Sequence, residues 1–158
     1  MFDLSPVLDQ LSVPGNFDIA VPEYFNFGVD VIDARAADGD KTAYIWVDRS
    51  GSVVEHHSFS DLSQASTRFA NVLHQIGARK GDCAVVIMPR VPAWYEVVIG
   101  CIKAGVVAMP GTNLLTAKDI EYRINKSNAT VAVVSMEHVS KIETIKDHCP
   151  TLQHLILI

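Results

Sequence analysis

The sequence predicts an α/β fold, a mostly parallel βαβ sheet with a β-hairpin on its N-terminal side. Between residues 83 and 158, short apolar runs of strand length alternate with segments of helical periodicity. Such alternation predicts right-handed βαβ units. Before it, two runs rich in β-branched and aromatic residues, 42–47 and 53–59, flank a turn that contains Gly51, and this pattern predicts the hairpin.

The composition is that of a soluble globular domain, with 158 residues, 49% hydrophobic and 20% charged. The net charge of -5 gives no electrostatic basis for binding nucleic acid or an anionic membrane. The longest apolar stretch, 97–110, is interrupted by glycines and a lysine and is shorter than the ~20 residues of a membrane span. No basic residue precedes Arg35 and the cysteines lie far apart, so the sequence predicts a cytoplasmic protein without a targeting segment.

In the first half of the chain, residues 1–27 contain prolines and a glycine and are predicted to form an arm without regular structure. Apolar residues at helical spacing predict a short helix over 28–37. After the hairpin, Ser60 is the predicted N-cap of a long helix that Gly77 ends in a left-handed conformation. The apolar stripe of this helix consists of Leu62, Ala65, Phe69, Leu73 and Ile76.

In the second half, the continuous apolar run 83–88 predicts a strand covered on both faces. Pro92 opens a helix that is apolar nearly all round and extends to Ala104. Thr116 and Asp119 have the spacing of a capping box for a further helix. The other predicted elements are strand 106–109, strand 130–135, a helix with Val139, Ile142 and Ile145 facing inward, and strand 155–158.

The last predicted strand, 155–158, is aliphatic and has no predicted helix to cover it, so it would form an exposed sheet edge. We therefore expect residues 28–158 to be part of a larger domain that continues beyond residue 158. Residues 1–27 form its N-terminal arm in this division of the chain.

Ligands of parallel α/β sheets bind at the carboxyl ends of the strands, which directs attention to the loop 110–115. Gly111 allows close backbone approach, and Thr112 provides a hydrogen-bonding side chain ahead of a helix. The alternative is a connection in which these residues only shape the turn. Arg90 and Lys141 are candidate anion ligands, for which a salt bridge or a solvated helix face is the alternative.

Other chemistry finds little support in the sequence. His148, Cys149 and His154 match no usual zinc spacing, and His56 and His57 point to opposite faces of a strand. Trp94 and Tyr95 are predicted core residues, with an acyl pocket as the alternative. No metal ligand set and no catalytic residue is predicted in this chain.

Three segments carry a resemblance to a known family. They are Pro-Arg-Val-Pro-Ala-Trp-Tyr at 89–95, Gly-Cys-Ile-Lys-Ala-Gly at 100–105, and the run from Met-Pro-Gly-Thr to Lys-Asp-Ile at 109–120. With the flanking elements, the chain resembles the N-terminal part of the AMP-forming acyl-CoA synthetases of the adenylate-forming superfamily. The 109–120 segment is most similar to the medium-chain branch.

This resemblance implies a parent enzyme that uses ATP, Mg²⁺ and coenzyme A to convert a carboxylic acid, through an acyl-adenylate, into an acyl-CoA. It also implies that Gly111, Thr112 and Leu114 are neighbours of coenzyme A, although Leu114 stands where this branch often has glutamine. The family's phosphate loop and catalytic lysine are absent from this sequence, so the chain alone is expected to be inactive. The alternatives are a non-catalytic interaction module of the same origin, which a partner would cover at the last strand, and an independent nucleotide-binding domain.

Overall fold

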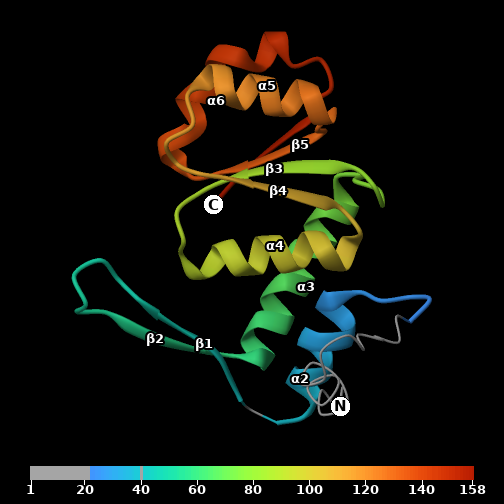
Figure 1. Ribbon diagram of the computed structural model, residues 1–158, viewed down its shortest axis with the longest axis vertical. Helices are drawn as coiled ribbons and strands as arrows, with labels where there is room; N and C mark the ends of the chain where they lie inside the picture. The colour runs from blue at the N-terminus through green and yellow to red at the C-terminus, as the bar shows by residue number, and fades with distance from the viewer. Residues whose placement is uncertain (1–21, 40) are drawn as a thin grey trace, which may run out of the picture.

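A computed structural model describes residues 22–39 and 41–158. A four-stranded sheet lies between two layers of helices, and a two-stranded hairpin projects from one of these layers (Figure 1). The α/β class predicted from the sequence is therefore confirmed. Most of the predicted N-terminal arm, residues 1–21, lies outside the described residues.

The central sheet has the strand order β4-β3-β5-β6, and every neighbouring pair of strands is parallel. Its strands are β3 (Cys83–Ile87), β4 (Val107–Gly111), β5 (Val131–Val134) and β6 (His154–Leu157). The strands β3 and β5 are central, and their apolar residues are almost wholly buried, as expected for strands covered on both faces. Each connection between sequential strands contains a helix, as the alternation in the sequence predicts.

Helices cover both faces of this sheet, as Figure 1 shows. On one face lie α3 (Phe59–Gln75) and α4 (Pro92–Ala104), and on the other lie α5 (Ala117–Ser127) and α6 (Val139–Ile145). Short helical turns, η2 (Met136–His138) and η3 (Lys146–His148), flank α6. The predicted bounds of α4 are confirmed at both ends, and Gly105 ends that helix with a φ of 71°.

Side chains alternate between the two faces along the central strands, and this alternation builds two apolar cores. Val85 packs into the core under α5 and α6, whereas Val86 packs into the core under α3 and α4. Both side chains are fully buried. The sheet is therefore the shared wall of the two cores.

The N-terminal part of the described chain packs on α3 and α4 rather than on the sheet. A π-helix, η1 (Phe27–Asp33), continues directly into α2 (Ala34–Ala37), so the predicted helix over 28–37 is confirmed. The Asn26 side chain accepts from the backbone N–H of Gly28 and donates to the carbonyl of Ile102 in α4. The hairpin of β1 (Thr42–Val47) and β2 (Val54–Ser58) is antiparallel, as predicted.

The N-cap of α3 differs from the prediction. Ser58, not Ser60, caps the helix: its hydroxyl accepts from the N–H of Asp61 at 3.1 Å, and the Asp61 carboxylate accepts from the Ser58 N–H at 3.0 Å. The physical reason is the acidic residue at the third helical position, since Ser60 has a serine there and cannot form the reciprocal pair. The capping box of Thr116 and Asp119 in α5 forms as predicted.

Strand β4 is longer than predicted and includes Pro110 and Gly111. Pro110 is tolerated because β4 is an edge strand that pairs only with β3, so its missing N–H breaks no second ladder. A Cβ atom at Gly111 would lie 2.6 Å from Cδ1 of Leu115. A larger residue at position 111 would therefore displace the side chain of Leu115, and Gly111 ends the strand instead of lying in the loop.

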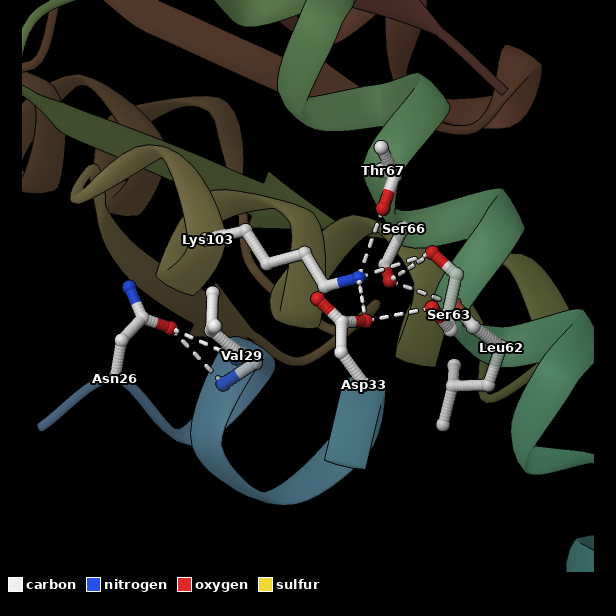
Figure 2. Close-up of polar contacts among 9 residues, drawn as sticks. Asn26, Val29, Asp33, Leu62, Ser63, Ser66, Thr67 and Lys103 are labelled. Atoms are coloured by element: carbon white, nitrogen blue, oxygen red, sulfur yellow. Dashed lines mark hydrogen bonds and ion pairs between the residues drawn. The ribbon is translucent and has the colours of Figure 1, made fainter. Parts of the chain in front are cut away.

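A polar clamp joins η1, α3 and α4 (Figure 2). Lys103 of α4 donates from its ammonium to Oδ1 of Asp33 at 2.5 Å, to the carbonyl of Ser63 at 3.0 Å and to Oγ1 of Thr67 at 2.9 Å. The Ser63 hydroxyl donates to the same Asp33 oxygen. All three donors of the ammonium are thus satisfied, which allows a lysine side chain that is only 6% exposed.

No helix within 22–39 and 41–158 is long and apolar enough to cross a membrane.

Candidate functional site

The candidate site is a cleft of about 410 Å³ at the carboxyl ends of β3 and β4. This is the edge of a parallel sheet at which ligands bind. Its walls are the loop between β3 and α4 and the loop between β4 and α5. The lining residues are Met88, Pro89, Arg90, Trp94, Pro110, Gly111, Thr112 and Asn113.

The first wall is held by the hairpin. The indole N–H of Trp46 in β1 donates to the carbonyl of Arg90 at 3.0 Å, so the backbone of this loop is fixed from a distant part of the chain. The Arg90 residue is exposed and supplies the positive charge of the cleft. Trp94 is half-buried and forms an edge-to-face pair with Tyr95, with ring centroids 5.2 Å apart. Trp94 thus lies partly in the core, as predicted, and also lines the cleft.

The second wall is a tight turn. The N–H of Leu115 donates to the carbonyl of Thr112 at 3.2 Å, and the N–H of Leu114 donates to the Thr112 hydroxyl at 3.3 Å. Of the three residues that the resemblance implies near coenzyme A, Gly111 and Thr112 line the cleft. Leu114 does not line it, and its side chain is 86% exposed to solvent.

Lys141 of α6 contacts this turn from behind. Its ammonium donates to the carbonyl of Leu115 at 2.7 Å and to the carbonyl of Asn113 at 3.4 Å. The sequence favoured a solvated helix face for this lysine. The half-buried side chain instead lies against the β4–α5 turn, where its ammonium bonds to two backbone carbonyls.

His138 lies one helical turn before Lys141 and was missed in the sequence, where a lone histidine after a strand gives no signal. It is 3% exposed, and neither ring nitrogen has a hydrogen-bond partner in the described part of the chain. Burial, followed by the charge of Lys141, lowers the pKa of His138, so the neutral ring is the stable form. The side-chain oxygen of Asn113 is also buried, with no hydrogen-bond partner among the described residues.

The histidines and cysteines, for which the sequence predicted no joint site, lie at separate places in the structure. His56 is exposed, and His57 stacks on Tyr44 with ring centroids 4.7 Å apart. Within 22–39 and 41–158, no three histidine, cysteine or acidic side chains are grouped as metal ligands. Cys101 and Cys149 are buried free thiols, and burial raises the pKa of both, to about 12 for Cys101.

The family described as "AMP-binding enzyme" matches residues 32–158 of this chain. The match covers well over half of the sequence and includes both walls of the cleft. The chain therefore belongs to the family of AMP-binding enzymes.

Curated relatives narrow this class. The chain is 36% identical to the mouse mitochondrial acyl-coenzyme A synthetase ACSM1, over 99% of this chain and 30% of that protein. It is 39% identical to the human mitochondrial acyl-coenzyme A synthetase ACSM4, over 87% of this chain and 25% of that protein. The chain thus spans less than a third of the length of these relatives.

Solved structures agree with the fold. The anthranilate CoA ligase AuaEII, in complex with anthranoyl-AMP, superimposes with a TM-score of 0.74 at 27% identity, over 87% of this chain and 26% of that one. The N-terminal domain of FACL13 from Mycobacterium tuberculosis has the same TM-score at 23% identity, over 85% of this chain and 34% of that one. The second likeness supports the fold alone.

The comparisons confirm the resemblance to acyl-CoA synthetases of the medium-chain branch and overturn one prediction. The cytoplasmic location predicted from the sequence is wrong, because the named relatives are mitochondrial proteins. The absence of an arginine-rich start was too weak a signal to decide the compartment.

Proposed function

We propose that this chain is the N-terminal segment of an AMP-forming ligase that joins a medium-chain fatty acid, or another carboxylic acid, to coenzyme A. Membership of the AMP-binding family and the acyl-coenzyme A synthetase relatives support this proposal. The structural observation that carries it is the cleft between the β3–α4 and β4–α5 loops, at the sheet edge where α/β enzymes bind ligands.

The proposed reaction has two steps. A carboxylate oxygen attacks the α-phosphorus of ATP, which forms an acyl-adenylate and releases pyrophosphate. The sulfur of coenzyme A then attacks the acyl carbon, a thioester forms, and AMP leaves. Mg²⁺ in the parent enzyme would neutralise phosphate charge in the first step.

The described residues fit some of these ligands better than others. Thr112, Asn113 and the Arg90 guanidinium offer hydrogen bonds and positive charge to a polar chain such as that of coenzyme A. No carboxylate cluster suited to Mg²⁺ occurs in the described part, and the sequence has no phosphate loop or catalytic lysine. We therefore assign this segment a supporting role, in which it forms one wall of the coenzyme A site.

The rest of the gene product is the proposed partner of this segment. Apolar side chains of the hairpin are strongly exposed, among them Ile45 at 55% and Val54 at 53%. Burial of such side chains is favourable, so we propose that the remainder of the enzyme covers the hairpin and β6. A mitochondrial location is proposed from the names of the relatives.

The test uses the complete gene product with a series of fatty acids. We expect acid-dependent exchange of pyrophosphate into ATP, and, when coenzyme A is added, release of AMP together with a thioester. The 158-residue chain alone should catalyse neither reaction. Release of ADP in place of AMP, or no acid-dependent turnover by the complete protein, would contradict the proposal.

A further inference from the structure

The contact between α6 and the β4–α5 turn has no role in the reaction as described above. Lys141 and the turn are 26 and 28 residues apart along the chain at the two carbonyls that the ammonium contacts. Hydrogen bonds from a charged donor are roughly twice as strong as neutral ones. This pair of bonds therefore fixes the turn to a helix that does not line the cleft.

The two hydrogen bonds from the Lys141 ammonium, called the tether below, act on a short stretch of the β4–α5 turn. Lys141 binds the carbonyls of Asn113 and Leu115, the residues on either side of Leu114. The Leu115 side chain is buried in the core, Leu114 faces solvent, and Thr112 and Asn113 line the cleft. The tether thus acts at the point where the chain turns from the cleft wall into the core.

No other polar bond from a distant element reaches residues 112–115 within the described part of the chain. The remaining bonds of these residues are local, from the N–H groups of Leu114 and Leu115 to Thr112. Lys141 forms no ion pair with a described carboxylate, whereas Lys146, which directly follows α6, pairs with Glu143 at 2.8 Å. Within the described residues, the Lys141 ammonium therefore interacts mainly with the two carbonyls of the turn.

We propose that Lys141 is a positioning residue, whose ammonium holds the β4–α5 turn in the conformation that receives coenzyme A. This inference rests on the proposed function, because it concerns the second step of that reaction. A turn that loses its tether shifts relative to the opposite wall, and small displacements of binding groups have large kinetic effects. Under the proposed function this wall belongs to the coenzyme A site, so the first step, in which the acid and ATP react, should not depend on it.

The experiment compares Lys141→Met, which keeps most of the side-chain volume, with Lys141→Arg, which keeps the charge. In the complete gene product, Lys141→Met should raise KM for coenzyme A about tenfold, an effect expected from a misplaced binding wall. Acid-dependent pyrophosphate exchange should stay unchanged. Lys141→Arg should restore much of the coenzyme A affinity, and the control Lys146→Met should match the wild type.

A second readout does not depend on activity. Amide hydrogen exchange of Leu114, Leu115 and Thr116 should be faster in Lys141→Met than in the wild type, and unchanged in Lys146→Met. If both half-reactions fall together, or if exchange in the turn is unaltered, Lys141 has no positioning role. If the wild-type protein has no ligase activity, the proposed function fails, and the exchange data still decide whether Lys141 holds the turn.

Discussion

His138 shows how a single residue links burial to pH. Its ring is buried, its nitrogens lack partners in the described part of the chain, and its pKa is lowered from the ordinary value of about 6.5. Protonation of this buried ring places a charge beside the Lys141 ammonium, and the Glu137 carboxylate, with an oxygen 3.4 Å from Nε2 of His138, offsets that cost only in part. Protonation of His138 is therefore less favourable in the folded state than in the unfolded state.

The resulting prediction concerns stability in acid. Because the folded pKa lies below the unfolded one, the unfolded state binds more protons as the pH falls through about 6.5, and stability is lost below that value. Urea unfolding at about pH 8 and about pH 5 should show a smaller loss for His138→Gln than for the wild type. The exposed His56→Gln is the control. An equal loss in all three proteins would show that His138 does not titrate on unfolding.

Single residues also show which parts of the site sequence can predict. Gly111 and Thr112 line the cleft, and their place at the carboxyl end of a strand could be predicted because strand ends and turn-forming residue types are both visible in sequence. Their contact with coenzyme A stays a prediction. The tether by Lys141 was not, because which carbonyl a lysine reaches depends on how two distant helices pack. The sequence also does not show that Leu114 faces solvent and not the cleft, because residue types alone do not fix which way a side chain points from a turn. Its proximity to coenzyme A stays a prediction.

At the scale of elements, the clamp around Lys103 holds η1 to the two helices behind it. Lys103→Met removes an ammonium that is 6% exposed and leaves the Asp33 carboxylate, which is 36% exposed, with only Ser63. We expect a loss of about 2 kcal/mol in the free energy of unfolding, since bonds to charged groups are the stronger ones and Asp33 remains partly solvated.

The matched control for this clamp is Lys41→Met. Lys41 pairs with Asp38 at 2.6 Å, but both side chains are well exposed, at 51% and 40%. Such pairs contribute little, so its effect on urea unfolding should be far smaller than that of Lys103→Met. Equal effects of the two substitutions would show that the buried network adds nothing beyond a surface ion pair.

Elements were predicted well where local chemistry defines them and less well at their ends. Helix α4 was predicted from Pro92 to Gly105 because both signals are local. Strand β4 was predicted too short because its status as an edge strand, which lets it contain Pro110, depends on the strand order. Ser58 and Ser60 both lie close enough to the start of α3 to be read as its N-cap, and the acidic residue three positions after Ser58 decides between them.

The whole molecule is organised by a sheet whose central strands serve two cores at once. Val85 and Val86 are adjacent in β3, both fully buried, and they face opposite layers of helices. If the layers form one cooperative unit, weakening either core must destabilise the entire sheet. Sequence alone predicts that both faces are covered, but not that the faces unfold together.

The last prediction tests this cooperativity. Val85→Ala and Val86→Ala each remove buried methyl groups and should each cost about 2 kcal/mol. The exposed Val72→Ala on α3 should cost far less. Because the two β3 side chains pack in separate cores, the double variant should lose about 4 kcal/mol, the sum of the two.

Two probes of unfolding distinguish the possibilities. Tryptophan fluorescence reports on Trp94, which packs against the core under α3 and α4, and on Trp46 of the hairpin, which contacts α3. Far-ultraviolet circular dichroism reports on helices of both layers. In every variant the two urea transitions should coincide. A fluorescence midpoint that stays in place when Val85→Ala lowers the circular dichroism midpoint would mean that the layer of α5 and α6 unfolds separately. In that case α6 could unfold while the sheet stays folded, and the β4–α5 turn would lose its hydrogen bonds to Lys141 before the sheet itself unfolds.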